Sequence, residues 1–418
     1  MHINVIGINY RTAPVAIREK VAICSRKLED ALSLLRSYFA HGILVSTCNR
    51  TETYATEPDA RNKSLTFLNA YLGVPEDVLS EHLYSYEDKA AIKHLFRITA
   101  GLDSMVLGEY EVLGQIGTAL ETAEKAGMVS LPLRQLFRSA VRTGRLVREK
   151  TGISRNALSV SSVAVELASQ AVGSLEAGKL VVIGAGEAGR LVARAARERG
   201  ARRIAVTSRT IDRAASLAES LGGTPFSLEN LTDELRTASV VIACADAPHC
   251  ILNREQVAAA MSGRPHLPLV VIDIAVPRNV DPSVKEITGV FLYNIDDLAQ
   301  ISERNRKLRE SEILRASEII EDEADAFTSW WHTLESRPIV TALMSKAEAI
   351  RLAHLNKTMK KLRPLSDEER ESLDAMTKAI VTRLLCDPIE HLKTKGNGDG
   401  DYAALVSELF RLGEVTRE

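Results

Sequence analysis

The first 152 residues mix two spacings of hydrophobic positions. Short apolar runs are typical of strands, whereas apolar residues three or four apart are typical of helices. Strand-like runs occupy residues 2–8, 43–47 and the segment up to Tyr54, and helical spacing occupies 90–98 and 133–150. Short strands mixed with helices predict an α+β domain, which we place at residues 1–152.

The middle of the chain alternates strand-like and helical patterns. The strand-like runs lie at residues 180–183, 204–207, 240–244 and 269–272, with helical patterns between them. Such alternation predicts a parallel sheet that is covered by helices on both faces. We therefore expect a Rossmann domain at residues 153–293.

The last part of the chain has a helical pattern. Residues 290–337 contain neither Gly nor Pro, and apolar residues recur at helical spacing through the second half. This predicts a long spinal helix at 294–337, followed by an all-α domain at 338–418. Ser366-Asp-Glu-Glu369 is a capping box that would begin another helix. Residues 395–401 (KGNGDGD) would form a loop before a short last helix.

These patterns together predict a multidomain α/β protein. An N-terminal α+β domain is followed by a Rossmann domain, a long spinal helix and an all-α C-terminal domain. A helical tail behind a Rossmann domain is most simply an oligomerisation module, here of a homodimer. A helical cap that packs on its own subunit is the alternative.

Composition narrows the class of protein. The 418 residues are 45% hydrophobic and 26% charged, which allows a sizeable core and argues against disorder. With 53 basic and 55 acidic residues the formal net charge is −2, so a nucleic-acid partner requires basic residues sorted onto one face. The five cysteines are scattered and form no CxxC pair, which argues against disulfides and structural zinc. We expect no signal peptide, no membrane span, no metal site and a cytoplasmic location.

A glycine motif marks the candidate nucleotide site. The strand-like run at 180–183 leads into GAGEAG and then into a helical pattern. In this context the first glycine permits a tight turn, the second lets the backbone approach a pyrophosphate, and the third lets the helix pack on the strand. The helix N-terminus then faces the phosphates. A glycine-rich turn without a ligand is the less favoured alternative. The motif consists of Gly184, Ala185, Gly186, Glu187, Ala188 and Gly189.

The end of the next strand indicates which dinucleotide binds. An NAD site would present Asp or Glu there to the ribose hydroxyls, but this chain has Ser208, Arg209 and Thr210 and no acid before Asp212. Arg209 offers a planar cation suited to a 2′-phosphate, and its two neighbours offer hydroxyls. We therefore expect NADPH rather than NADH. An exposed arginine at a helix start is the alternative.

One cysteine differs from the others in its surroundings. A lone cysteine is usually a small buried hydrophobe, which we expect of Cys24, Cys244 and Cys386. Cys48 instead follows a strand end and lies two residues before Arg50, whose charge could favour the thiolate. The residues alone leave a reactive thiol and a structural cysteine both open.

Several segments together resemble the glutamyl-tRNA reductase family. STCNRTE (46–52), HLFRITAGLDSMVLGEYEVLGQ (94–115) and GAGEAG with the later SRT carry the resemblance. The opening VIGINYRTAPVAIRE, LVVIDIAVPRNVDP (269–282) and FLYNIDDL (291–298) match as well. The resemblance covers the chain up to the long helix and is weaker in the tail. Its specific features are the cysteine string, the LDSMVLGE segment and their order before the Rossmann motif.

The resemblance implies a reaction and two catalytic residues. It implies reduction of glutamyl-tRNA(Glu) by NADPH to glutamate 1-semialdehyde through a cysteine thioester, the first committed step of tetrapyrrole (5-aminolevulinate) biosynthesis. Cys48 would be the nucleophile, and His94 would polarise the ester or assist proton transfer. From the pattern alone, His94 would be read as a solvated or satisfied histidine. Because the product aldehyde is reactive, glutamate-1-semialdehyde aminomutase becomes a candidate partner.

The resemblance also implies which residues hold the glutamyl group. A side-chain carboxylate is best held by a bidentate arginine, for which Arg50 is the candidate. Tyr110 and Glu111 depart from the family pattern, which usually reads GEPQ or similar at this point. The full set is Thr47, Asn49, Arg50, Ser104, Glu109, Tyr110, Glu111 and Gln115.

The residue types fit this chemistry. An aminoacyl ester is already activated, so a thiolate can attack it without a full hydrolase triad, and no cluster with metal-ligand spacing is visible in the sequence. Two other functions stay open: a shikimate-dehydrogenase-like NADP oxidoreductase, and a nucleotide-sensing Rossmann scaffold protein. The first would leave STCNRTE and the long helix unexplained.

Overall fold

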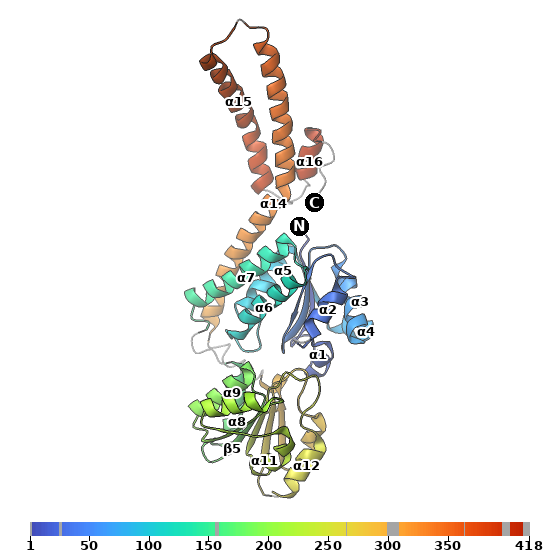
Figure 1. The fold of residues 1–418 in the computed structure, drawn as a ribbon, viewed down its shortest axis with the longest axis vertical. Coiled ribbons are helices and arrows are strands. Elements are labelled where there is room, and N and C mark those ends of the chain that lie inside the picture. The colour runs from blue at the N-terminus through green and yellow to red at the C-terminus, as the bar shows by residue number, and fades with distance from the viewer. Residues whose placement is uncertain are drawn as a thin grey trace. The chain divides into compact units, whose positions relative to one another are not determined.

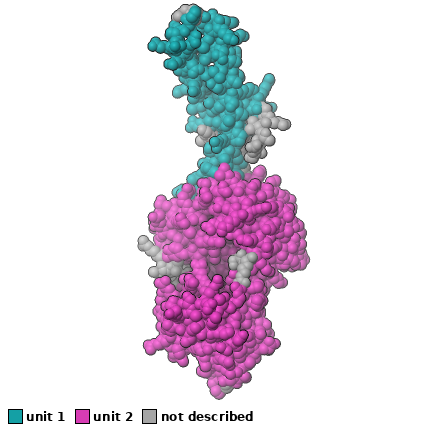
Figure 2. Space-filling model, in the orientation of Figure 1, with its two compact units in different colours: residues 1, 322–418 teal, residues 2–321 magenta. Residues whose placement is uncertain are grey.

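The computed structural model describes residues 2–24, 27–154, 159–264, 266–298, 309–362, 364–394 and 402–412. The chain divides into two compact units, residues 2–321 and residues 322–418 (Figure 2). None of the described helices combines the length and the apolar character that a bilayer span requires.

The first unit begins with an antiparallel four-stranded sheet in the order β2-β3-β1-β4 (Figure 1). The strands are β1 (Asn4–Asn9), β2 (Gly42–Ser46), β3 (Arg50–Ala55) and β4 (Tyr84–Glu87). The three predicted strands are confirmed, whereas β4 was not predicted because its four residues contain no apolar run. The accompanying helices are α1 (Val15–Val21), α2 (Leu28–Leu35), α3 (Ala60–Leu72), α4 (Glu76–His82), α5 (Asp88–Thr99), α6 (Glu111–Lys125) and α7 (Leu131–Lys150).

The second sheet of this unit has six parallel strands in the order β10-β9-β8-β5-β6-β7. Side chains at 180 and 182 belong to one buried cluster and those at 181 and 183 to another, as alternation along a strand covered on both faces requires. The predicted parallel sheet between helical layers is therefore confirmed (Figure 1). The strands are β5 (Lys179–Ile183), β6 (Arg203–Thr207), β7 (Thr224–Pro225), β8 (Val240–Ala243), β9 (Leu269–Asp273) and β10 (Val290–Asn294).

Helices of both faces connect these strands. One cluster packs under α8, α9 and α10, and the other under α11 and α12. Among the described residues of the domain three short 3-10 helices complete it, and the last of them follows β10 directly. The elements are α8 (Val160–Val172), α9 (Glu187–Glu198), α10 (Ile211–Ser220), η2 (Leu228–Asn230), α11 (Leu231–Thr237), α12 (Arg254–Ser262), η3 (Pro282–Glu286) and η4 (Ile295–Leu298).

The long helix is displaced from its predicted bounds of 294–337. Residues 295–298 form η4, residues 299–308 lie outside the described part, and α14 spans Glu310–Met359. The predicted end at Pro338 is wrong, although a proline removes an N–H donor and crowds the preceding turn. Trp331 and Leu343 are buried on either side of this proline, so packing favours a helix both before and after it.

The second unit is helical, as predicted. The capping box is confirmed: the N–H of Ser366 donates to Glu369 (2.9 Å), and the N–H of Glu369 donates to the Ser366 hydroxyl (3.2 Å). It begins α15 (Asp367–Thr394). The predicted KGNGDGD loop lies outside the described residues, and the short last helix is α16 (Tyr402–Leu409).

Replacing Gly144 with Ala should destabilise the protein. Gly144 lies where α7 approaches the end of α5, and an added Cβ would stand 2.6 Å from the carbonyl oxygen of Thr99. Overpacking of this kind costs about 1–3 kcal/mol. Gly117→Ala on α6 is the matched control, because nothing lies within 4 Å of its added Cβ. It should stabilise by about 0.5–1 kcal/mol. Urea denaturation measures both, and equal effects would contradict the packing described.

Candidate active site

Cys48 lies, half-buried, in the tight connection between β2 and β3. The N–H of Thr47 donates to the carbonyl of Arg50 (2.8 Å), and the N–H of Tyr10 donates to the carbonyl of Asn49 (3.0 Å). The Thr47 hydroxyl in turn accepts from the N–H of Asn49 (3.1 Å). These bonds fix the backbone on both sides of the cysteine, at the strand end where the sequence predicted it.

The surroundings of the Cys48 thiol are acidic. Burial, together with the charges of Glu109 and Glu111, raises the pKa of the thiol to about 12, and the charge of Arg18 opposes this rise. The expectation that Arg50 supplies the favourable cation is wrong, because Arg18 takes that place. At neutral pH the thiol is protonated in this state, so attack requires a group that removes the proton or a cation that offsets the carboxylates.

Arg50 is buried in a network of charges beside the cysteine loop. Its Nη1 donates to Glu52 (2.8 Å) and lies 3.4 Å from Asp103, and its Nη2 donates to the carbonyl of Asp103. Burial alone would raise the pKa of Glu52, but Arg50 together with His94 and Tyr84 holds it well below its usual range. Arg50 therefore pairs with carboxylates of its own chain, and a grip on a substrate carboxylate requires an exchange of partners.

His94 reaches the same network from α5. Its Nε2 lies 2.9 Å from Glu52, and its Nδ1 lies 4.0 Å from Asp103. The rings of Tyr84 and Tyr86 lie 5.3 and 4.8 Å from the imidazole, centroid to centroid. Glu52 thereby orients the histidine ring, which is what a proton-transfer histidine needs.

Ser104 and Glu109 come from the loop after α5, which two glycines shape. Gly108 has a φ of +78° and donates its N–H to the carbonyl of Gly101 (2.9 Å). An added Cβ on Gly108 would lie 2.2 Å from the carbonyl oxygen of Ile153, so only glycine fits. Glu109 is 6% exposed. Burial raises its pKa to about 7, against a hydrogen bond with Ser104 that lowers it.

Tyr110, Glu111 and Gln115 lie at the start of α6. One carboxylate oxygen of Glu111 is buried without a hydrogen-bond partner among the described residues. Burial and the nearby charge of Glu187 raise the pKa of Glu111. Tyr110 is 63% exposed, and the Arg148 guanidinium lies 5.4 Å from its ring. Gln115, one turn after Glu111, is exposed. Glu111 thus lies near the thiol and the glycine motif, while Tyr110 and Gln115 face outward.

The sequence reasoning missed Glu52, Asp103 and Arg18. A signal for Glu52 was present: Arg50, Glu52 and Tyr54 alternate along β3, so their side chains share one face. The Tyr54 hydroxyl indeed donates to Glu52 (2.7 Å). Arg18 carried no local signal, because only the tertiary fold brings α1 to the cysteine loop.

The glycine motif has the geometry that the sequence predicted. Gly184 has a φ of +124°, and its added Cβ would lie 2.9 Å from the N of Ala245. Gly189 packs even closer, since its Cβ would lie 2.0 Å from the carbonyl oxygen of Gly184. Gly186, the N-cap of α9, has nothing within 4 Å of an added Cβ. The turn is therefore packed from below and open at Gly186, which fits a pyrophosphate at the helix N-terminus.

The residues that follow β6 lie beside this motif in the sheet order. The N–H of Gly184 donates to the carbonyl of Thr207 (2.8 Å), which joins the two strand ends. Ser208 is half-buried, and Arg209 and Thr210 are exposed. Arg209 therefore presents an exposed guanidinium at this strand end.

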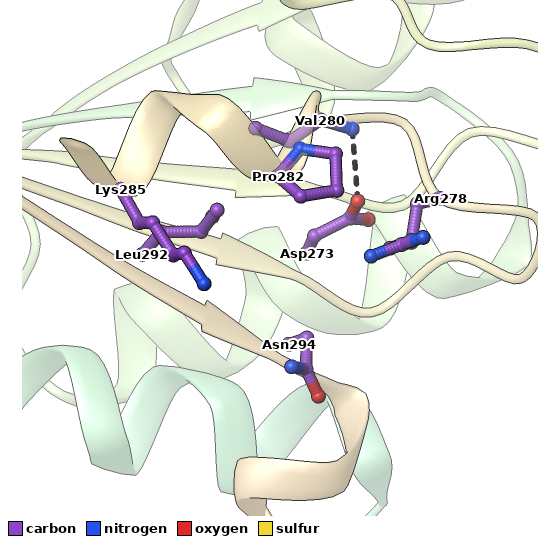
Figure 3. Close-up of a pocket in the computed structure, with 7 residues that line it drawn as sticks. All are labelled: Asp273, Arg278, Val280, Pro282, Lys285, Leu292 and Asn294. Carbon is purple, nitrogen blue, oxygen red and sulfur yellow. Dashed lines mark hydrogen bonds between the residues drawn. The ribbon is translucent and has the colours of Figure 1, made fainter. Parts of the chain in front are cut away.

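A small cavity of about 120 Å³ lies at the end of β9 (Figure 3). Its buried acid, Asp273, accepts backbone N–H groups of Ala275 (3.0 Å), Asn279 (2.8 Å) and Val280 (2.9 Å). Burial raises the pKa of Asp273 to about 7 although these bonds oppose it. Arg278 follows in the same loop and is directed to the N-terminal domain (see below). Asp273 therefore orders the loop after β9 through its hydrogen bonds to three backbone N–H groups.

Fold and site together define a class: an oxidoreductase with a Rossmann domain and a cysteine-bearing α+β domain. Three family models match the chain in order. They are glutamyl-tRNA(Glu) reductase N-terminal domain (6–151), shikimate/quinate 5-dehydrogenase (166–301) and glutamyl-tRNA(Glu) reductase dimerisation domain (315–412). The chain belongs to the glutamyl-tRNA reductase family.

Relatives match along the whole chain. Glutamyl-tRNA reductase of Geobacter sulfurreducens is 40% identical over 419 residues, which cover 99% of this chain and 96% of that protein. The enzyme of Natranaerobius thermophilus is 38% identical over 421 residues, covering 99% and 92%. The solved structure of glutamyl-tRNA reductase from Methanopyrus kandleri has 30% identity and a TM-score of 0.50 over 98% of both chains. The shikimate-dehydrogenase and scaffold alternatives are not favoured, because the dehydrogenase model matches the middle domain alone.

Glu111→Gln should make the Cys48 thiol more acidic. Removal of a neighbouring negative charge favours the thiolate, so the pKa of Cys48 should fall. The rate of Cys48 alkylation by iodoacetamide, followed against pH, should then rise at lower pH than in the wild type. Glu121→Gln, an exposed change on the same helix, is the control and should leave the profile in place. Identical profiles for Glu111→Gln and wild type would refute the electrostatic assignment.

Proposed function

We propose that the protein reduces the glutamyl ester of tRNA(Glu) to glutamate 1-semialdehyde with NADPH, through a thioester on Cys48. The observation that carries this proposal is the position of the thiol. Cys48 follows β2 in the family-specific domain and packs against a buried cluster that includes Val15, Met105 and Val106 of this domain together with residues of the Rossmann domain. An acyl group on its sulfur would therefore face the domain that carries the glycine motif.

In the first step the Cys48 thiol releases its proton to water, its sulfur attacks the ester carbonyl and forms a C–S bond, and the C–O bond to the ribose breaks. The substrate ammonium is bonded to the carbon next to this carbonyl, so it must approach Glu109 and Glu111 when the carbonyl reaches the sulfur. A cation there offsets the two carboxylates and lowers the pKa of the thiol. His94, oriented by Glu52 at 2.9 Å, is assigned the proton that the departing ribose oxygen needs.

The side-chain carboxylate of the glutamyl group is assigned to Arg50. This arginine lies 3.4 Å from the Asp103 carboxylate, a weak contact that a substrate carboxylate could replace. Asp103 would then stay with Arg11, to which it is already paired at 2.8 Å. Thr47, Asn49 and Ser104 supply the polar surface between this carboxylate and the thiol. Tyr110 and Gln115 are assigned to the outer rim of the site.

In the second step the thioester carbon is reduced to the aldehyde, the C–S bond breaks and the Cys48 thiolate regains a proton. NADPH would supply the hydride. The open backbone at Gly186 would receive its pyrophosphate, and Ser208, Arg209 and Thr210 would receive the 2′-phosphate. Ala185, Glu187 and Ala188 complete the loop around it.

The second unit is proposed to join two copies of the chain as a homodimer. A groove of about 310 Å³ between α14 and α15 is lined largely by apolar side chains. Met376, Ile380 and Leu384 on α15 are about half exposed or more. An apolar helix face of this kind is usually covered by a partner, and the family model that matches here is a dimerisation domain.

The semialdehyde product is reactive, which favours direct transfer to an enzyme that consumes it. We propose glutamate-1-semialdehyde aminomutase as that partner and the cytoplasm as the location of both.

Cys48→Ser should abolish aldehyde formation while NADPH binding is retained. A serine hydroxyl without an adjacent base is a poor nucleophile, and an oxygen ester accepts hydride less readily than a thioester. Wild-type protein given glutamyl-tRNA without NADPH should carry a glutamyl adduct on Cys48 in the mass spectrum of quenched samples. Cys386→Ser, an exposed cysteine on α15, serves as control and should behave as wild type. Substantial aldehyde production by Cys48→Ser would contradict the thioester mechanism.

Arg209→Ala should weaken binding of NADPH far more than that of NADH. Loss of charge-assisted hydrogen bonds to a 2′-phosphate costs about 1.5–3 kcal/mol, or roughly ten- to a hundredfold in Kd. Arg213→Ala, an exposed arginine one turn later on α10, is the matched control. Fluorescence titration with both nucleotides gives the ratio, and a ratio unchanged in Arg209→Ala would show that this residue does not contact the phosphate.

A further inference from the structure

Arg18 is an arginine on α1 that is 2% exposed. Its Nη1 donates to the carbonyl of Cys48 (2.6 Å), and its Nε donates to the carbonyl of Ala13 (3.2 Å). Its Nη2 donates to the carboxylate of Asp296, in η4 at the end of the Rossmann sheet. One buried guanidinium therefore holds the backbone of the cysteine and the nucleotide domain at the same time.

Asp296 is itself fixed from both sides. Its second carboxylate oxygen accepts the N–H of Val15 at the start of α1 (2.9 Å), and its own N–H donates to the Asn294 side chain (2.7 Å). Val15 also shares a buried cluster with Ile295 and Leu298 of η4. The contact between α1 and η4 is thus packed as well as charged.

A second ion pair joins the same two domains but does not touch the cysteine loop. Arg278, in the loop after β9, donates from Nε to the carboxylate of Glu19 on α1 (2.8 Å). Glu19 is the next residue after Arg18 in the chain. The two ion pairs involve neighbouring residues of α1. Of the two, the pair of Arg18 and Asp296 also contacts Cys48, and the pair of Glu19 and Arg278 does not. Variants of the two ion pairs therefore separate the effect of a weaker contact between the domains from the effect of a displaced thiol.

We propose that Arg18 is a positioning residue, which through Asp296 sets the Cys48 backbone relative to the nucleotide domain for the hydride-transfer step. This inference rests on the proposed function. Hydride transfer requires reacting atoms about 3–3.5 Å apart and aligned, and a displacement of about 1 Å can cost a hundredfold in rate. Attack on the ester, by contrast, involves groups of the N-terminal domain: Cys48, Glu109, Glu111 and His94.

Arg18 is also the cation that faces the thiol. Glu109 and Glu111 are the acids named above that raise the pKa of Cys48, and Arg18 acts against both. Loss of its charge therefore has a second, separable consequence, a less acidic thiol. Asp296 does not contact the sulfur, so its replacement should leave the acidity of Cys48 nearly unchanged.

The test compares Asp296→Asn, Arg18→Gln and the control Glu19→Gln in the full-length protein. Three rates are measured: Cys48 alkylation against pH, glutamyl loading of Cys48 without NADPH, and aldehyde formation with NADPH. For Asp296→Asn we expect alkylation, loading and NADPH affinity near wild type, with aldehyde formation lowered about ten- to a hundredfold. For Arg18→Gln the alkylation profile should also move to higher pH. Glu19→Gln should retain all three rates within about twofold.

Two results would overturn the proposal. One is an equal loss of loading and reduction in Asp296→Asn, which would mean a general structural role. The other is a loss in Glu19→Gln as large as that in Asp296→Asn, which would mean that any contact between the domains suffices. Failure of the proposed function itself would appear differently, as wild-type protein that neither loads Cys48 nor forms aldehyde. The alkylation profile of Arg18→Gln would still report on the contact with the thiol.

Discussion

The buried ion pair between Arg50 and Glu52 lies at the centre of a network that joins several elements of the N-terminal domain. A buried charge that loses its partner costs about 3–5 kcal/mol, so both side chains must stay paired and hydrogen-bonded. Glu52 accepts hydrogen bonds from the hydroxyls of Tyr54 and Tyr84 and is hydrogen-bonded to His94. Asp103 accepts a hydrogen bond from Arg50. These residues come from β3, β4, α5 and the loop after α5. The pair therefore joins four elements and orients His94 in the same network.

A second constraint follows from the order of charges around the sulfur. The thiol is adjacent to two acids and one arginine whose guanidinium is shared with the carbonyl of Cys48 and with Asp296. Such an arrangement keeps the resting cysteine protonated and poorly nucleophilic. In the proposed mechanism the reactivity of Cys48 would then depend on the positive charge of the substrate itself.

Much of the fold was predictable because its signals are local. Apolar runs predicted β1, β2 and β3 of the first sheet and β5, β6, β8 and β9 of the second, whereas β7 and β10 were not predicted. GAGEAG predicted the strand-turn-helix unit, and Ser366 with Glu369 predicted the start of α15. The misses have physical causes. β4 has no apolar run, and α14 passes through Pro338 because packing on both sides outweighs one lost hydrogen bond. The prediction that the charge of Arg50 favours the Cys48 thiolate is wrong, because a short separation in sequence does not determine where a side chain points. Alternation along β3 sends that guanidinium to Glu52, and the cation near the sulfur comes from α1.

The beginning of α14 has a consequence for how the sequence can vary. The carboxylate of Glu312 accepts the N–H of Gly152, and an added Cβ on that glycine would lie 3.3 Å from the same carboxylate. Two residues later, the Ser154 hydroxyl donates to the carbonyl of Gly108, next to Glu109. A larger side chain at 152 thus requires the Glu312 carboxylate to move by a few tenths of an ångström. Although 160 positions separate them along the chain, the two sites are expected to change together in evolution. Insertions between residues 150 and 154 would break the hydrogen bond of Ser154 that supports the loop after α5.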